Sequence, residues 1–96
     1  MKYANGTVLE ALHLVQYRQI PWHKRPPIFT SLQVLGLVRI VAQRPPVDTR
    51  YYTPVQIAEL TDKGRDEAAR LEARRRSPDW ELERQTDYVA DALTSA

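Results

Sequence analysis

A single glycine, Gly36, separates two stretches whose apolar residues repeat with different periods. Before it, apolar residues recur at the three-to-four spacing of one helix face, at Ile28, Phe29, Leu32 and Leu35. After it, every second residue lies on the same side of a strand, which groups Val38, Ile40 and Ala42. Glycine adopts the left-handed conformation that ends a helix at no steric cost. We therefore expect a helix over 27–35 that turns at Gly36 directly into a strand over 37–43.

Two further helices are predicted from capping residues. Thr7 stands three residues before Glu10, which is the spacing of a capping box, so the first helix is expected from residue 7 to 17 or 18. Thr61 is suited to cap another helix that ends near residue 76.

Proline-rich segments separate these elements. The segment QIPWHKRPP (19–27) contains three prolines and leaves room for a turn only. The segment RPPVDTRYYTP (44–54) is expected to form an exposed loop after the first strand. A second strand is predicted over 55–61, and it would pair with the first as an antiparallel hairpin.

Length and composition exclude several classes of protein. The 96 residues suffice for one domain with a modest core, and the absence of cysteine excludes disulfides and thiolate chemistry. The opening MKYANGTVLE lacks the apolar core of a signal peptide, and no apolar run approaches the roughly 20 residues of a membrane span. We expect a cytoplasmic protein without membrane contact.

Charge is divided unevenly along the chain. Residues 1–76 contain 13 lysines and arginines against 7 acids, whereas residues 77–96 contain one arginine against five acids. This balance favours contact between the basic part and an anion, although two ordinary solvated surfaces would show the same pattern. The expected organisation is a domain over 1–76 followed by a C-terminal segment over 77–96.

Two short motifs follow one another along the chain. The first is Leu35-Gly36-Leu37-Val38 and the second is Leu60-Thr61-Asp62-Lys63-Gly64-Arg65. Over residues 7–76 the chain resembles the winged-helix (winged helix-turn-helix) superfamily of small bacterial and phage DNA-binding regulators. In that family the recognition helix ends in the first motif, which opens a two-stranded wing, and the second motif opens the closing helix. The resemblance implies an α+β fold with a β-hairpin wing. Where the family has another helix before the recognition helix, this chain has IPWHKRPP (20–27).

The resemblance also implies a function, a transcriptional regulator that binds double-stranded DNA and needs no cofactor or metal. The helix over 28–35 would enter the major groove and present Thr30, Ser31 and Gln33. The other implied DNA-binding residues are Lys24, Arg25, Arg39, Arg44, Arg50 and Tyr51. Because these cations flank the helix rather than lie on it, they favour phosphate contacts over base reading.

Several residues leave two interpretations open. Trp22, beside His23-Lys24-Arg25, would either stack on a base or pack against its own core. The cluster Arg74-Arg75-Arg76 complements the dipole of a helix end, with a phosphate or acidic partner as the alternative. His13 and His23 lack a metal-ligand spacing, and no glycine-rich phosphate loop is present, so no enzymatic activity is predicted.

A different class of function also fits the sequence, a winged-helix scaffold that binds a protein as a phage-type inhibitor or accessory factor and does not bind DNA. The truncated helix-turn-helix half and the acidic C-terminal segment favour it.

The C-terminal segment is predicted to form a helix from Pro78 to Leu93. Its expected role is homodimerisation or docking of a protein partner through Trp80, Leu82, Val89 and Leu93. In one alternative the helix folds back on its own domain, with Trp80 and Tyr88 as anchors. In another, its acidic surface covers the basic part of the chain.

Overall fold

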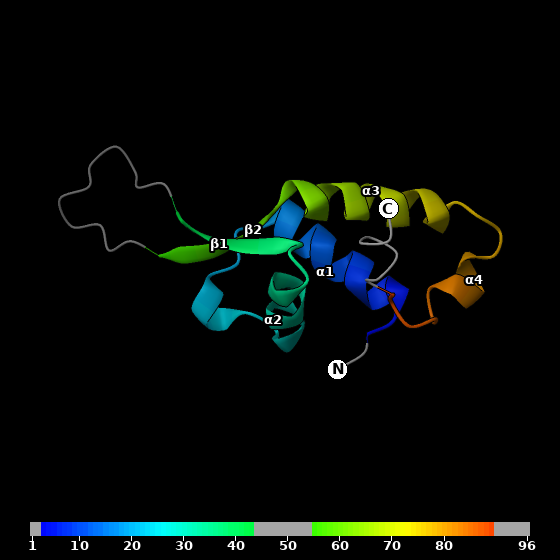
Figure 1. The fold of residues 1–96 in the computed structure, drawn as a ribbon, viewed down its shortest axis with the longest axis horizontal. Helices are drawn as coiled ribbons and strands as arrows, with labels where there is room; N and C mark the ends of the chain where they lie inside the picture. The colour runs from blue at the N-terminus through cyan, green and yellow to red at the C-terminus, as the bar shows by residue number, and fades with distance from the viewer. Residues whose placement is uncertain (1–2, 44–54, 90–96) are drawn as a thin grey trace.

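The computed structural model describes residues 3–43 and 55–89 of the chain (Figure 1). Within these ranges it is an α+β fold with four α-helices, one 3₁₀ turn and a two-stranded antiparallel hairpin. In chain order the elements are α1 (Asn5–Tyr17), η1 (Trp22–Lys24), α2 (Pro27–Val34), β1 (Val38–Ala42), β2 (Gln56–Leu60), α3 (Asp62–Arg75) and α4 (Trp80–Glu83). None of the helices in the described ranges combines the length and the apolar character needed to span a membrane.

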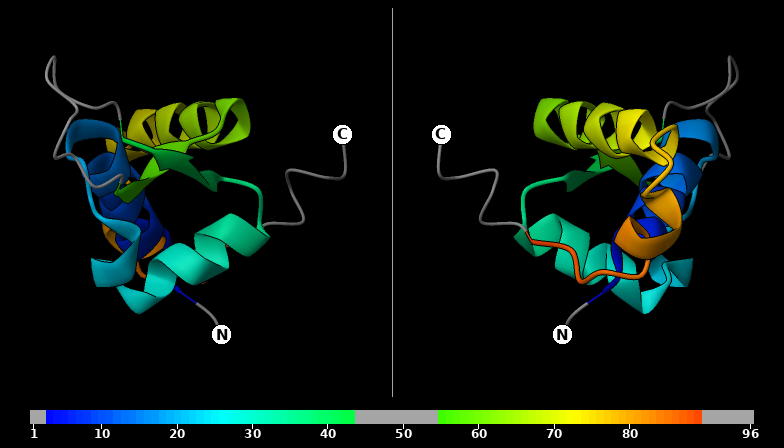
Figure 2. Two further views of the ribbon diagram at one scale, coloured as in Figure 1. Left: turned by 90° about the vertical axis from the view of Figure 1, so that its left-hand side faces the viewer. Right: turned by 90° about the vertical axis from the view of Figure 1, so that its right-hand side faces the viewer.

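The hydrophobic core lies where α1, α2, the hairpin and α3 meet. Figure 2 shows the hairpin between α3 on one side and α2 on the other. Leu12 of α1 and Phe29 of α2 have no exposed surface, and Leu71 of α3 is also fully buried. The helix α2 buries Ile28, Phe29 and Leu32. Because these three side chains hold one face of α2 against the core, the opposite face is turned to solvent.

The junction predicted at Gly36 is confirmed. The helix α2 ends at Val34, and Gly36 has a φ of +78°, in the left-handed region that other residues avoid. The amide of Gly36 donates to the carbonyl of Gln33 at 3.0 Å, which closes the helix end. The strand β1 begins two residues later, at Val38.

Replacing Gly36 with valine is expected to lower the free energy of unfolding by about 1–2 kcal/mol, because a Cβ is strained at positive φ. Gly36→Asn is the matched control, since asparagine tolerates this conformation better and is expected to lose less. Chemical denaturation measures both variants. Equal stability of Gly36→Val and the parent would contradict the strained junction.

The antiparallel hairpin is also confirmed, with a register that runs from Val38 opposite Leu60 to Ala42 opposite Gln56. The outer edge of β2 is partly covered by the proline-rich segment, because the amide of Ala58 donates to the carbonyl of Ile20 at 3.1 Å. That segment then forms only the single turn η1 before α2, as its prolines predict. The loop predicted over 44–54 lies outside the described residues.

The start of α3 packs directly on the end of α2. The Thr61 side chain accepts from the amide of Gly64 at 3.0 Å, so the predicted cap is confirmed. The same hydroxyl donates to the carbonyl of Gly36 at 2.6 Å, and Lys63 Nζ donates to the carbonyl of Leu35 at 3.2 Å. Carbonyls that a helix end leaves without partners are therefore satisfied by α3.

The capping box predicted at Thr7 is wrong. The helix α1 begins at Asn5, so Thr7 lies inside it, and no side chain caps the helix. Backbone carbonyls replace the side-chain cap, because the amides of Asn5 and Gly6 donate to Thr86 and Arg84 at 2.8 and 2.9 Å. The acceptors come from the far end of the chain, so no local pattern shows them.

The helix predicted from Pro78 to Leu93 is wrong as well. The helix α4 ends at Glu83, and the amide of Tyr88 then donates to the carbonyl of Tyr3 at 2.7 Å. Of the fold-back alternative, the anchoring is confirmed, since Trp80 and Tyr88 both pack against the core, although not on one helix. We call residues 79–89 the C-terminal strap. Its backbone pairs with the N-terminal residues instead of continuing as a helix, so Leu82 and Val89 do not share one helix face.

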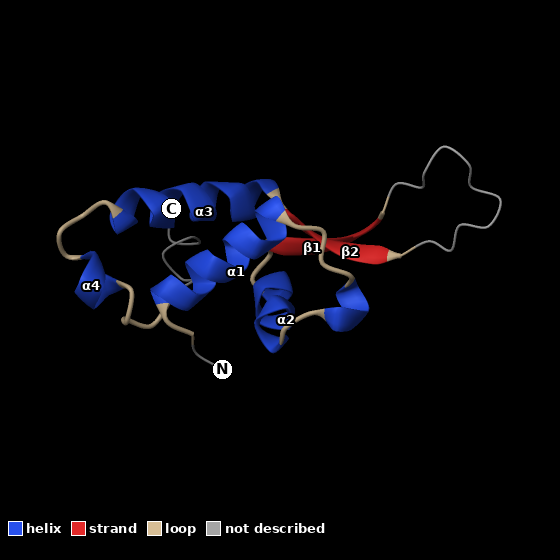
Figure 3. Ribbon diagram, turned by 180° about the vertical axis from the view of Figure 1, so that it is seen from behind, coloured by secondary structure: helices blue, strands red, loops and turns tan. Residues whose placement is uncertain are grey.

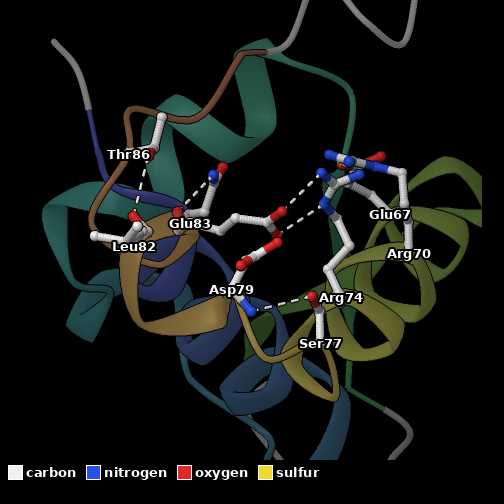
Figure 4. Close-up of polar contacts among 9 residues, drawn as sticks. Glu67, Arg70, Arg74, Ser77, Asp79, Leu82, Glu83 and Thr86 are labelled. Carbon is white, nitrogen blue, oxygen red and sulfur yellow. Dashed lines mark hydrogen bonds and ion pairs between the residues drawn. The ribbon is translucent and has the colours of Figure 1, made fainter.

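Side chains of α3 hold the strap in place (Figure 4). Arg74 donates from Nε and Nη2 to the two carboxylate oxygens of Glu83, each at 3.0 Å. Glu67 is 1% exposed and forms an ion pair with Arg70, and the hydrogen bond from this guanidinium to Glu67 raises the pKa of Arg70. The hydroxyl of Tyr88 is buried beside this pair.

Burial, with the nearby Glu67 carboxylate, raises the pKa of Tyr88 above its ordinary value of about 10. Below that pH the hydroxyl is neutral in both states. Above it the unfolded chain ionises first, so the free energy of unfolding is expected to fall as the pH rises beyond 10. Chemical denaturation as a function of pH measures this, and Tyr88→Phe is expected to flatten the decline. An identical slope in the variant would contradict the assignment.

Candidate nucleic-acid interface

The solvent-facing side of α2 carries two of the three residues predicted for it. Thr30 and Gln33 are exposed, whereas Ser31 is only partly so. Val34 lies one helical turn after Thr30 and is 82% exposed, the most exposed large apolar side chain among the described residues. Val34 is not among the residues predicted from the sequence for this surface, because an apolar residue next to Leu35 fits the buried pattern.

Arg25 is held in a fixed position at the beginning of α2. Its guanidinium lies 4.5 Å from the centre of the Trp22 ring, a cation–π arrangement. It also donates to the hydroxyl of Thr30 at 3.1 Å and to the carbonyl of Trp22 at 2.9 Å. Trp22 itself packs against the core, so the core interpretation of Trp22 is confirmed. Arg25 has no carboxylate partner in the described part of the chain.

The other predicted cations differ in their surroundings. Lys24 is exposed on η1 and has no ion-pair partner within residues 3–43 and 55–89. Arg39 is also exposed, but its guanidinium lies 3.3 Å from the carboxylate of Glu59 on the facing strand. Its charge is therefore balanced within the hairpin. Arg44, Arg50 and Tyr51 lie outside the described residues.

A cation that the sequence analysis missed lies at the other end of α2. Lys63 belongs to α3, and its Nζ reaches the carbonyl of Leu35. Figure 3 shows α2 with η1 at its beginning and the hairpin at its end, so positive charges stand at both ends of the helix. No local pattern predicts this placement, because it depends on the contact between α3 and α2.

One sequence feature could have indicated this surface. Residues 11–47 contain no aspartate or glutamate, although they include η1, α2 and β1. A run of this length without acids leaves the exposed face of α2 free of negative charge from its own and adjacent segments. The overall charge of +2 conceals this, since the acids are gathered elsewhere.

Two of the three arginines at 74–76 pair with carboxylates of the same chain. Arg74 pairs with Glu83 of the strap, and Arg75 pairs with Glu72 at 2.9 Å. A phosphate site there would compete with these carboxylates. The ion pairs and the dipole at the end of α3 are therefore sufficient to account for these arginines without an external partner.

An open hollow of about 440 Å³ lies beside the N-terminal part of α1, between this helix and α4. Its charged lining is mixed, because it contains Glu10, Glu81, Arg75 and Arg84, and Arg84 pairs with Glu81 at 3.0 Å. Nearby, His13 Nε2 lies 3.3 Å from the carboxylate of Glu72. The described residues contain no group of three His, Asp or Glu side chains arranged to hold a metal ion.

Comparison with protein-family models, with curated proteins and with solved structures finds no match to this chain.

Proposed function

We propose that this protein is a small winged-helix DNA-binding protein that acts as a transcriptional regulator, with α2 as the helix that enters the major groove. The observation that carries the proposal is the exposed face of α2, which lies between Lys24 and Arg25 at one end and Lys63 at the other. Such an arrangement suits a helix in a groove whose two rims are phosphate backbones.

The short turn η1 bears on how such a domain would dock. It stands where the winged-helix family has a full helix before the recognition helix. Lys24 and Arg25 belong to this turn or follow it directly, so they would supply the phosphate contacts on that side. Arg25 is well suited because Trp22 and Thr30 already hold its guanidinium, which lowers the entropy lost on binding.

Replacing Lys24 or Arg25 with alanine is expected to weaken binding to random duplex DNA without regard to sequence. Each variant should also reduce the slope of log affinity against log salt by about one unit, because one fewer counterion is released per lost phosphate contact. Fluorescence anisotropy across a salt series measures both quantities.

Arg75→Ala is the matched control, since it removes the same charge from the end of α3, far along the chain from α2. It is expected to keep the parent salt slope. Parent-like slopes for both Lys24→Ala and Arg25→Ala would show that this edge does not contact DNA.

A protein-binding role is the second candidate, and one observation favours it. Leu82 and Val89 of the C-terminal strap are 76% and 56% exposed, respectively. Exposed apolar side chains on an acidic segment suit a protein partner or a second copy of the chain. Leu93 lies outside the described residues, and homodimerisation stays a prediction. A protein-binding module would show no affinity for duplex DNA at any salt concentration.

A further inference from the structure

The chemistry of the exposed face of α2 is narrow enough to indicate which base pairs it suits. All eight residues of α2, from Pro27 to Val34, are uncharged. Guanine is read best by arginine or lysine, and cytosine by aspartate or glutamate. The helix offers neither of these pairs of side chains to a groove, so its own residues lack the contacts that favour a G·C pair.

The residues that do face solvent match the other base pair. Gln33 is exposed, and its side-chain amide has no hydrogen bond in the part of the chain that the structure describes. A free amide of this kind can pair with N6 and N7 of adenine. Val34 presents its two methyl groups beside it, 82% exposed, and apolar groups contact the methyl group of thymine.

Thr30 is less available for base reading than these two residues, because its hydroxyl already accepts from Arg25. The position of Val34 is in turn well defined. Ile28, Phe29 and Leu32 fix the rotation of α2, and Lys63 and Thr61 hold its C-terminal end. An exposed side chain on a helix held at both ends keeps its direction when it meets a ligand.

We infer that α2 selects A·T base pairs in the major groove, with Val34 against the thymine methyl group and Gln33 on the edge of adenine. This inference rests on the proposed DNA binding and adds a sequence preference to it. Val34 is then a specificity-determining residue, and its exposure allows it to contact the thymine methyl group.

In the first step, the full-length protein selects binding sites from a pool of duplexes whose central base pairs are randomised. In the second step, thymine in the selected site is replaced with uracil. That replacement removes only the methyl group. It is expected to weaken binding of the parent protein by about three- to fivefold, the value of one buried methyl group. The Val34→Ala variant should lose affinity for the thymine duplex and show a smaller further loss with uracil than the parent.

The second arm replaces adenine with 7-deazaadenine, which should weaken the parent by about fivefold or more and leave Gln33→Ala unaffected. Leu82→Ala is the control, because it removes an equally exposed apolar side chain from the strap. The inference would be overturned if the selected sites conserved only G·C pairs, or if uracil weakened the parent and Val34→Ala equally. Salt-dependent binding that persisted in either case would leave the proposed DNA binding standing. Absence of binding to any duplex would overturn the proposed function together with the inference.

Discussion

Replacing Gly64 with alanine is expected to lower the free energy of unfolding by about 2 kcal/mol or more, although alanine is the better helix former by about 1 kcal/mol. Gly64 lies in the first turn of α3 and is buried. A Cβ there would overlap the backbone carbonyl of Leu37, which cannot rotate away as a side chain can. That carbonyl also accepts from the amide of Thr61 at 3.1 Å, so it has little room to move.

The matched control for Gly64→Ala is Ala69→Gly, an opposite change at an exposed position of the same helix. It is expected to lose only the propensity difference of about 1 kcal/mol. Urea unfolding of both variants gives the two values under one set of conditions. A Gly64→Ala variant that is more stable than the parent would show that propensity outweighs the close approach.

Ending the chain after Arg76 is expected to lower the free energy of unfolding by about 3 kcal/mol or more. The truncation removes Trp80 and Tyr88, which are partly buried against the core, and full burial of a large apolar side chain contributes about 1.5–3 kcal/mol. It also exposes the Glu67–Arg70 pair and leaves the first turn of α1 without its carbonyl acceptors. Small domains are stable by only about 5–15 kcal/mol, so the shortened chain is expected to be marginal.

Thermal and urea unfolding of the truncated chain measure this loss. Arg74→Ala serves as the control, because it breaks only the half-exposed ion pair with Glu83 and should lose about 1 kcal/mol or less. A chain ending at Arg76 that unfolds like the full chain would show that the strap adds nothing to the domain. The division into 1–76 and 77–96 would then stand as predicted.

The predictions confirmed at Gly36 and Thr61 share a physical basis, which is that the deciding interaction lies within a few residues. Gly36 ends α2 because only glycine adopts its φ without strain, and Thr61 caps α3 through an amide three residues away. The alternation in β1 is also local, whereas the pairing of the hairpin joins residues as far apart as Val38 and Leu60. Such features are visible in a short window of sequence.

The incorrect predictions concern places where the deciding interaction comes from a segment far away in the sequence. The periodic pattern of Leu82 and Val89 suits a long helix, but the backbone around Tyr88 pairs with Tyr3 instead. The capping box at Thr7 has the right spacing, yet carbonyls from Arg84 and Thr86 take over its role. In both cases a distant segment offered hydrogen bonds that local propensity, worth a few tenths of a kcal/mol per residue, cannot outweigh.

The same distinction applies to the candidate interface. Lys24, Arg25, Thr30 and Gln33 could be selected from the amino-acid order alone, since they flank or occupy one short helix with an uncharged surface. The placement of Lys63 at the end of α2, the exposure of Val34 and the pairing of Arg39 with Glu59 were decided by packing between elements. Periodicity and capping follow from backbone geometry within one element, whereas the neighbours of a side chain depend on which elements bury the core together.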